Sequence, residues 1–317
     1  MSVELLIGLS AVIVAIDSDQ PVSLVTNRSD GVPALPYGKF DPAADRTFEL
    51  ALRGWVSRQT GFTLGYVEQL YTFGDRGRET PSAVIPDADA DARTISVGYL
   101  ALTPEAAKPE IEFDTRWAGW YRHFPWEDHR AGRPAIIDAT ISPLLNTWAA
   151  GNAQRLDRAR VAFALDCQPW IEERALERYE LLYEAGLVEE SVRDAGLPKD
   201  LPDLGLSMAS DHRRIFATAI SRLRGKLKYR PVLFELMPER FTLSRLQIGA
   251  EAILGVTLHK QNFRRALDRT GLVEGTGDME SGTGGRPAEV FRFRRELLRR
   301  RALSGIAAPT ARKDSVS

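Results

Sequence analysis

The feature that most constrains this chain is a basic amphipathic segment near its carboxyl end that leads straight into a glycine-rich stretch. Phe263 and Leu267 lie four residues apart on one apolar face of a helix, which Gly271 is expected to end. Two short β-prone runs follow, at residues 272–274 and 289–293, with a loop dense in Gly, Ser, Thr and Asp between them. The pattern predicts a helix followed at once by a hairpin with a long tip.

The charge of this segment is opposite to that of the rest of the chain. Residues 255–301 hold 11 Lys and Arg against 6 Asp and Glu, a net charge of +5, whereas the whole chain is formally −1 and residues 1–254 carry −7. A basic helix followed by a hairpin is the layout of a winged helix-turn-helix, whose helix enters the major groove while the wing lies along the backbone. The alternative is a solvated helix face beside an ordinary hairpin.

Length and composition set outer limits. A chain of 317 residues, 44% of them hydrophobic, can build two domains with their own cores. The apolar opening run at residues 3–16 is too short to span a bilayer, and Glu4 stands where a signal peptide would be positive, so we expect a buried strand and no membrane segment. The single cysteine, Cys167, excludes an internal disulfide, and the four histidines lack metal-ligand spacing. These features fit a cytoplasmic protein without a metal site.

The first quarter of the chain has a recognisable order of elements. Strands are expected at residues 6–16 and 22–26, and a glycine-containing segment at 35–40 leads through a turn into a helix over about 43–59. Gly61 is well placed as the left-handed cap after that helix. A strand, a glycine loop, a helix and a terminal Thr-Gly are together the architecture of a Nudix loop-helix-loop.

Further pieces of sequence occur in a characteristic order and spacing between residue 6 and about residue 295. The most specific are Arg222-Leu223-Arg224-Gly225-Lys226-Leu227, Phe241-Thr242-Leu243, Leu254-Gly255, Asn262-Phe263-Arg264-Arg265 and Gly285-Arg286-Pro287-Ala288. In these pieces the chain resembles the Nudix-related bacterial transcription regulators of the NrtR and NadQ types. The resemblance implies an α+β fold, with a Nudix-like α/β/α sandwich fused to a C-terminal winged helix-turn-helix, and control of genes of NAD biosynthesis or salvage.

The Nudix helix departs from the catalytic pattern. A catalytic Nudix helix needs an Arg-Glu pair and then a Glu-Glu pair, because carboxylates one turn apart bind Mg²⁺ and activate water. Counting back from Gly61, those four positions hold Gly54, Trp55, Arg58 and Gln59. A cation at one of them would repel a divalent metal. The sequence therefore predicts no catalytic residues, no required cofactor and a domain that binds a nucleotide without cleaving it.

The effector site is harder to place. Five aromatic residues crowd into positions 117–126, and an aromatic wall beside arginine could stack an adenine and hold a phosphate. Alternatively, these aromatics form a core or a dimer surface. The candidate effector-binding residues are Tyr37, Lys39, Arg53, Trp126 and Arg130. Residues from about 142 to 205 have helical patterns and are interpreted as an insertion in the Nudix-like domain, 1–236.

The second domain is expected at residues 237–301, with a disordered tail at 302–317. Thr242 is a candidate N-cap for its first helix. By the resemblance, Lys260, Asn262, Arg264 and Arg265 face DNA, where asparagine suits adenine and arginine suits guanine. Arg286 in the wing would reach phosphate or the minor groove. Phe263, Leu267 and Leu272 should be core, and Arg265 could instead pair with Asp268 or Asp278.

Together these patterns predict a homodimeric repressor that binds double-stranded operator DNA and senses an NAD-related nucleotide, namely ADP-ribose, NAD or ATP. A dimer is expected because one winged helix reads only half of an operator. Two alternatives stay open. One is a Nudix-type nucleotide pyrophosphatase with an accessory basic domain, and the other is an adaptor whose basic hairpin meets an acidic protein.

Overall fold

The computed structural model describes residues 5–28, 30–78, 92–104, 106, 114–196, 200–229, 231–281 and 287–294. Six strands of this described part form the larger sheet, in the order β4-β5-β1-β2-β6 with β3 beside β1. Their bounds are β1 Leu5–Asp17, β2 Gln20–Thr26, β3 Tyr37–Lys39, β4 Tyr66–Phe73, β5 Arg93–Leu102 and β6 Thr115–Gly119. β1 is central because it pairs in parallel with β5 on one side and antiparallel with β3 and β2 on the other.

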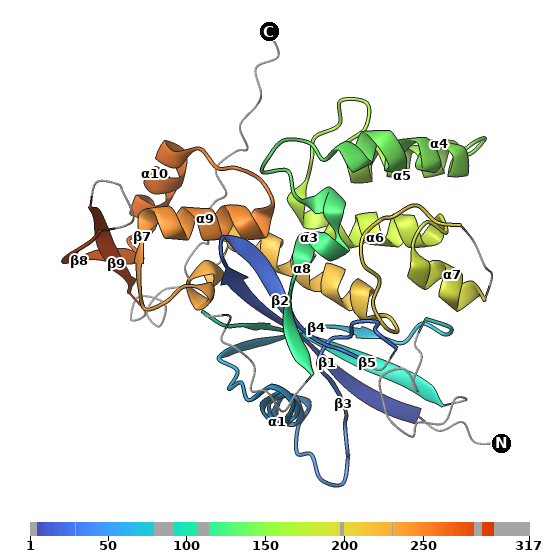
Figure 1. The fold of residues 1–317 in the computed structure, drawn as a ribbon, viewed down its shortest axis with the longest axis horizontal. Coiled ribbons are helices and arrows are strands. Elements are labelled where there is room, and N and C mark those ends of the chain that lie inside the picture. The colour runs from blue at the N-terminus through green and yellow to red at the C-terminus, as the bar shows by residue number, and fades with distance from the viewer. Residues whose placement is uncertain are drawn as a thin grey trace.

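Strand β1 is buried on both faces, which explains why its sequence is an almost continuous apolar run. Leu9 and Ile13 pack beneath helix α1, Phe48–Thr60, whereas Val12 and Val14 join the opposite cluster with helix α8, His212–Tyr229. The two helices therefore cover opposite faces of the sheet (Figure 1). The predicted α+β class, with an α/β/α sandwich, is confirmed.

Helix α1 begins later than the sequence pattern predicts. Residues 42–44 are a turn, in which the Asp41 side chain accepts the Ala43 N–H at 2.9 Å. The helix starts only after Thr47, whose hydroxyl accepts the Leu50 N–H at 3.2 Å. Both residues are side-chain caps that compete with helix extension, so the apolar pattern alone misplaced the start. The predicted end is confirmed, since Gly61 has φ 70°.

The segment between β6 and α8 is helical, and its helices α4 to α7 lie within the stretch of about 142–205 where the sequence has helical patterns. It contains α3 Trp120–His123, α4 Ser142–Trp148, α5 Ala153–Phe163, α6 Ala175–Glu184 and α7 Glu189–Ala195, with short 3-10 or π turns at Pro125–Glu127, Ile137–Ile141 and Glu172–Arg174. Helices α4 to α7 gather on the α8 side of the sheet, away from α1 (Figure 1). Helix α6 begins at Ala175, directly after the 3-10 turn.

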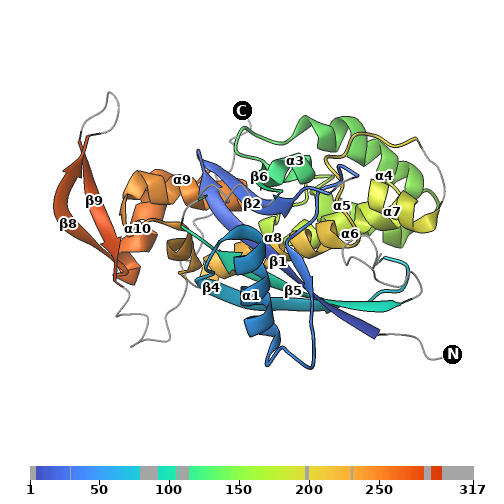
Figure 2. The same cartoon turned by 60° about the horizontal axis from the view of Figure 1, so that its bottom comes forward.

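The C-terminal part is a small helical unit with its own sheet. After a 3-10 turn at Val232–Leu236 come β7 Arg240–Thr242, α9 Leu243–Leu254, α10 Lys260–Thr270, β8 Val273–Glu280 and β9 Ala288–Phe293. The strands pair in the order β7-β9-β8. Thr242 caps α9 by accepting the Arg245 N–H at 3.2 Å, as expected. The β8–β9 hairpin projects at the end of the molecule opposite the insertion helices (Figure 2).

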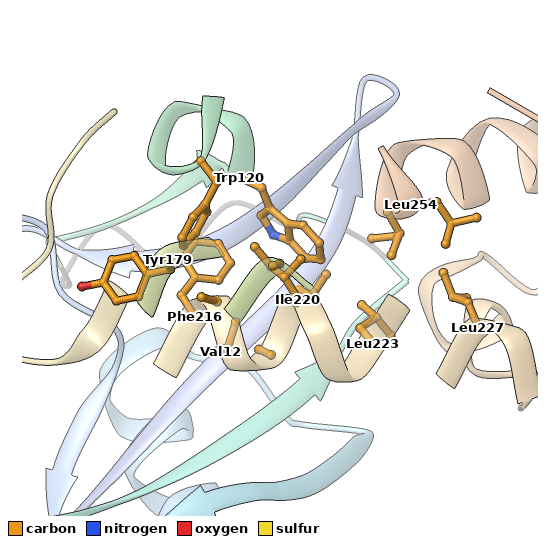
Figure 3. Close-up of a cluster of buried hydrophobic side chains, with 14 of the residues drawn as sticks. Val12, Trp120, Tyr179, Phe216, Ile220, Leu223, Leu227 and Leu254 are labelled. Carbon is orange, nitrogen blue, oxygen red and sulfur yellow. The ribbon is translucent and has the colours of Figure 1, made fainter. Parts of the chain in front are cut away.

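One hydrophobic cluster runs from the α8 face of the sheet through the helical segment to the winged unit. Its buried members include Trp120 from α3, Tyr179 from α6, Phe216 from α8 and Leu254 from α9. Figure 3 shows Leu254 on the same side of the cluster as Leu223 and Leu227. The winged unit therefore shares a core with the sheet domain. Among the described residues, no helix combines the length and apolar character needed to cross a bilayer.

Candidate functional site

Helix α10 presents one buried and one exposed face. Phe263 and Leu267 are buried, as is Leu272 just after the helix, so the predicted core positions are confirmed. Gly271 ends the helix with φ 60°. The helix is thus fixed by its apolar face, and its other residues are free to define a surface.

The four predicted DNA contacts on α10, Lys260, Asn262, Arg264 and Arg265, are all exposed. None of their side chains forms a hydrogen bond or an ion pair with another residue in the described ranges. Arg265 pairs with neither Asp268 nor Asp278 there, because Asp278 accepts from Arg240 instead. Exposed cations that bind no carboxylate are available to phosphate or to base edges.

The described part of the wing has a different electrostatic character. Arg292 and Arg294 of the hairpin both donate to Glu274, at 2.6 Å and 2.8 Å. Hydrogen bonds from Arg292 and Arg294 hold the pKa of Glu274 below its usual value. One carboxylate therefore binds both arginines, and these three side chains keep a net charge of +1. Arg286, the predicted wing contact, lies outside the described residues.

Helix α1 is bound to strand β3 by the residues that stand in the Nudix motif positions. The Trp55 indole lies against Gly38, where an added Cβ would be only 2.2 Å from the ring. The Trp55 Nε1–H donates to the Lys39 carbonyl at 3.1 Å, and the Gln59 amide donates to the Tyr37 carbonyl at 2.9 Å. At these two positions a catalytic Nudix helix has carboxylates that bind a metal. In this chain Trp55 and Gln59 stand there instead and donate hydrogen bonds to backbone carbonyls of β3.

The remaining charged groups on α1 are also paired. The Arg58 guanidinium lies 4.9 Å from the centre of the Trp55 ring. Arg53 forms an ion pair with Glu49 at 2.9 Å and donates to the Gly65 carbonyl at 3.2 Å. No group of three or more His, Cys, Asp or Glu residues that could hold a metal ion occurs within the ranges the structure describes.

The five effector candidates do not come together in one place. Lys39 lies on β3 and Arg53 on α1, whereas Tyr37 of β3 is buried with its ring centre 5.5 Å from that of His212 in α8. Arg130 lies elsewhere, because it bridges Asp128, at 2.8 Å, and the β1–β2 turn, donating to the Asp19 carbonyl at 2.9 Å. It therefore cannot complete a site with the first three in this arrangement.

Trp126 is a core residue. Its side chain is fully buried, with edge contacts to Phe124 and Phe163 in the cluster on the α8 side of the sheet. Trp120 and Phe124 are fully buried as well. The interpretation of Trp126 as an effector contact is therefore wrong for this structure, and for these three rings the alternative of a packed core is the one observed. The sequence pattern of aromatic and charged residues did not distinguish a packed core from an effector site.

A further polar cluster lies at the junction with the winged unit and was not anticipated from the sequence. Glu127, Arg178 and Arg224 are fully buried near the C-terminal end of α9, and the Glu127 carboxylate forms an ion pair with each of the two arginines. Burial alone would raise the pKa of Glu127, but the two guanidinium groups outweigh it and hold that pKa below its usual value. The sequence pieces containing Arg224 and Gly255 were the available signal, although nothing in them showed that they meet.

Comparisons with known proteins agree with this architecture. Residues 233–293 match the NrtR DNA-binding winged helix domain. A relative described as an ADPR responsive transcriptional repressor NtrR, from Acinetobacter baylyi, is 42% identical over 90 residues, which are 28% of this chain and 36% of the relative. The match thus spans about a third of that relative's length.

Solved structures extend the likeness over nearly the whole chain. Shewanella oneidensis NrtR complexed with a 27mer DNA is 20% identical, with 95% of this chain and 98% of that chain covered and a TM-score of 0.57. A MutT/nudix family protein from Enterococcus faecalis is 16% identical, with 93% and 88% covered and a TM-score of 0.52. The resemblance to NrtR-type regulators and the fold of a Nudix-like domain with a C-terminal winged helix are confirmed.

Proposed function

We propose that this protein is a DNA-binding transcriptional repressor of NAD biosynthesis or salvage genes, whose Nudix-like domain senses an NAD-related nucleotide. The observation that carries the proposal is helix α10, which stands in a matched winged helix domain with an apolar face in the core. Its exposed face carries Lys260, Arg264 and Arg265 without carboxylate partners among the described residues. Such a face suits the negatively charged major groove.

The proposed effector is ADP-ribose, with NAD and ATP as the other candidates. The partly matching relative is described as ADPR responsive, which supports ADP-ribose as the first nucleotide to test. Lys39 of β3 and Arg53 of α1 are the proposed contacts, and Tyr37 of β3, whose ring lies against His212, is a further candidate. Arg130 is a separate candidate on the β1–β2 turn.

We further propose that the Nudix-like domain does not hydrolyse its ligand. The proposal rests on Trp55, Arg58 and Gln59 standing where a Nudix hydrolase has carboxylates, and on the hydrogen bonds that commit Trp55 and Gln59 to strand β3. Incubation with ADP-ribose and Mg²⁺ should therefore release no AMP above a protein-free control. Release of AMP that follows the protein concentration would restore the pyrophosphatase alternative.

DNA binding is tested by electrophoretic mobility shift on the protein's own upstream region and on promoters of NAD-synthesis genes. ADP-ribose, NAD and ATP are added in separate lanes. The Arg264→Ala/Arg265→Ala double variant should lose at least about 30-fold in affinity for a specific fragment, since two such contacts at about 1–3 kcal/mol each contribute about 2 kcal/mol or more. A wild-type protein that shifts no promoter, and a double variant indistinguishable from it, would rule out the repressor.

The matched control is Arg292→Ala/Arg294→Ala, which also removes two positive charges from the winged unit. Because both side chains are paired with Glu274, their loss should change DNA affinity by no more than about 2- to 3-fold.

A proposed homodimer, working in the cytoplasm, would place two α10 helices on successive half-sites. Light scattering of the free protein measures that assembly directly.

A further inference from the structure

The C-terminal end of helix α9 is held by residues of the Nudix-like domain. The Tyr121 hydroxyl donates to the Ala252 carbonyl at 2.6 Å, and the Arg224 Nε donates to the Ile253 carbonyl at 2.9 Å. The last carbonyls of a helix have no partner within the helix and form its negative end. A hydroxyl and a guanidinium from outside the winged unit therefore complete this helix.

The residue that follows α9 is packed equally closely. Gly255 has φ 73°, and its carbonyl accepts the His129 N–H at 2.7 Å. A Cβ at this position would lie 2.3 Å from the Glu127 carbonyl oxygen and 2.9 Å from an Arg224 nitrogen. Only glycine allows both the left-handed conformation and this approach. The turn that leads into α10 thus begins at a point fixed against the neighbouring domain.

Behind this contact lies a buried three-residue ion network. Arg178 of α6 binds Glu127 through two hydrogen bonds, of 2.5 Å and 2.8 Å, and Arg224 binds the same carboxylate. Other donors of the two guanidinium groups reach backbone carbonyls, including Ile171 from Arg178 at 3.0 Å and Glu172 from Arg224 at 3.0 Å. The helical insertion is in this way joined to α9 through Glu127 and Arg224.

The opposite end of α9 has looser surroundings. A cavity of about 660 Å³ lies between the β1–β2 turn and the winged unit, and its lining includes Ser18, Asp19, Thr242, Arg245 and Gly249. Helix α9 therefore has one end fixed by buried hydrogen bonds and one end beside open space. The fixed end is the one that continues, after five residues, into α10.

We propose that Tyr121 and Arg224 are positioning residues for DNA recognition. Arg178 links the helical insertion to the same contact, because it binds the carboxylate that also binds Arg224. These residues set the direction in which α10 leaves the Nudix-like domain, although they do not touch DNA themselves. The inference rests on the proposed DNA-binding function and deepens it. It names the contacts through which the sheet domain and its insertion act on the recognition helix.

The first test compares Tyr121→Phe with Tyr66→Phe. Both variants remove one hydroxyl, but the Tyr66 hydroxyl contacts Glu68 and Lys226 of the sheet domain. Fluorescence anisotropy gives the affinity for a specific promoter fragment and for a random duplex of equal length. We expect Tyr121→Phe to lose about 5-fold in specific binding, the effect of one hydrogen bond, and Tyr66→Phe to keep the wild-type ratio of specific to random binding.

The second test is amide hydrogen exchange of the free variants over residues 252–262. Loss of the Tyr121 hydrogen bond should speed exchange at the end of α9 and the start of α10, whereas Tyr66→Phe should not. Arg178→Lys, which keeps the charge but loses the two-pronged contact, should act in the same direction from the insertion. Hydrogen exchange is measured on the free protein, so this test does not depend on DNA binding.

The outcomes separate the two proposals. If the wild-type protein binds no duplex while exchange at residues 252–262 rises in Tyr121→Phe, the repressor proposal fails and the positioning contacts stand. If Tyr121→Phe and Arg178→Lys lower thermal stability but keep wild-type DNA affinity and exchange, their role is structural and the inference is overturned. Should Arg178→Lys not fold, Tyr121→Phe alone decides between these results.

Discussion

At the scale of single residues, the packing of Gly38 against Trp55 determines what either position accepts. An alanine Cβ at residue 38 would lie 2.2 Å from the indole, so the ring or the strand has to move. The cost of such overpacking is about 1–3 kcal/mol.

We therefore predict that Gly38→Ala lowers the free energy of unfolding by that amount, measured by urea denaturation. Gly65→Ala is the control, because nothing lies within 4 Å of a Cβ there. In a double-mutant cycle, Trp55→Ala should remove most of the effect of Gly38→Ala. Additive effects of the two substitutions would contradict the steric explanation.

Two buried histidines and one half-buried histidine predict how stability depends on pH. Burial lowers the pKa of His123 and of His129 to about 4, and that of His212 to about 3, from an ordinary value of 6.5. Below pH 6.5 the unfolded chain binds protons that the folded chain excludes, so stability falls with decreasing pH. The slope is up to about 1.4 kcal/mol per pH unit for each histidine.

Chemical denaturation at several values between pH 6.5 and pH 5 measures this slope, above the range where most carboxylates titrate. The informative variant is His212→Asn, because the Asn Oδ1 can accept the Leu35 N–H that His212 Nδ1 accepts at 3.0 Å. We expect a shallower slope in that variant. An unchanged slope would mean that His212 does not contribute to the acid sensitivity.

At the scale of elements, arginines on α10 and on the β8–β9 hairpin should contribute differently to the salt dependence of DNA affinity. DNA binding that releases counterions weakens with salt by a slope of about −0.9 for each phosphate contacted. Arg264→Ala should reduce that slope by about 1 if the side chain binds phosphate, and leave it unchanged if the side chain reads a base. Arg292→Ala should leave it unchanged in either case, because Glu274 already binds this arginine. Anisotropy titrations at several salt concentrations measure the slope.

The elements also show how far sequence reasoning reached. Helix α10 and the cap at Thr242 followed from local patterns, because periodic apolar residues and capping side chains act within a few residues. The late start of α1 was not predicted, because the side chains of Asp41 and Thr47 can both accept backbone N–H groups and the apolar pattern does not show which of them begins the helix. The Glu127, Arg178 and Arg224 network joins residues up to 97 positions apart, so no local pattern could indicate it. Trp126 was misread because core and ligand-binding aromatics have the same composition.

At the scale of the whole molecule, the proposed sensing and DNA binding must be linked in both directions. If ADP-ribose changes the affinity for operator DNA by some factor, the operator must change the affinity for ADP-ribose by the same factor. We predict that the two factors agree when calorimetric titrations of ADP-ribose with and without operator are compared with DNA titrations. A change in DNA affinity with no reciprocal change would mean that the nucleotide acts elsewhere, for example on aggregation.

The contact between Trp55 and Gly38 has a consequence for how this chain can evolve. Replacing Trp55 by glutamate would restore one motif carboxylate, yet it would leave the volume of an indole unfilled and the Lys39 carbonyl without its donor. Such a chain would lose stability before it gained any chemistry, because Arg58 and Gln59 would still be in place. A return to hydrolysis therefore requires several simultaneous substitutions, and selection acting one substitution at a time would preserve the non-catalytic form.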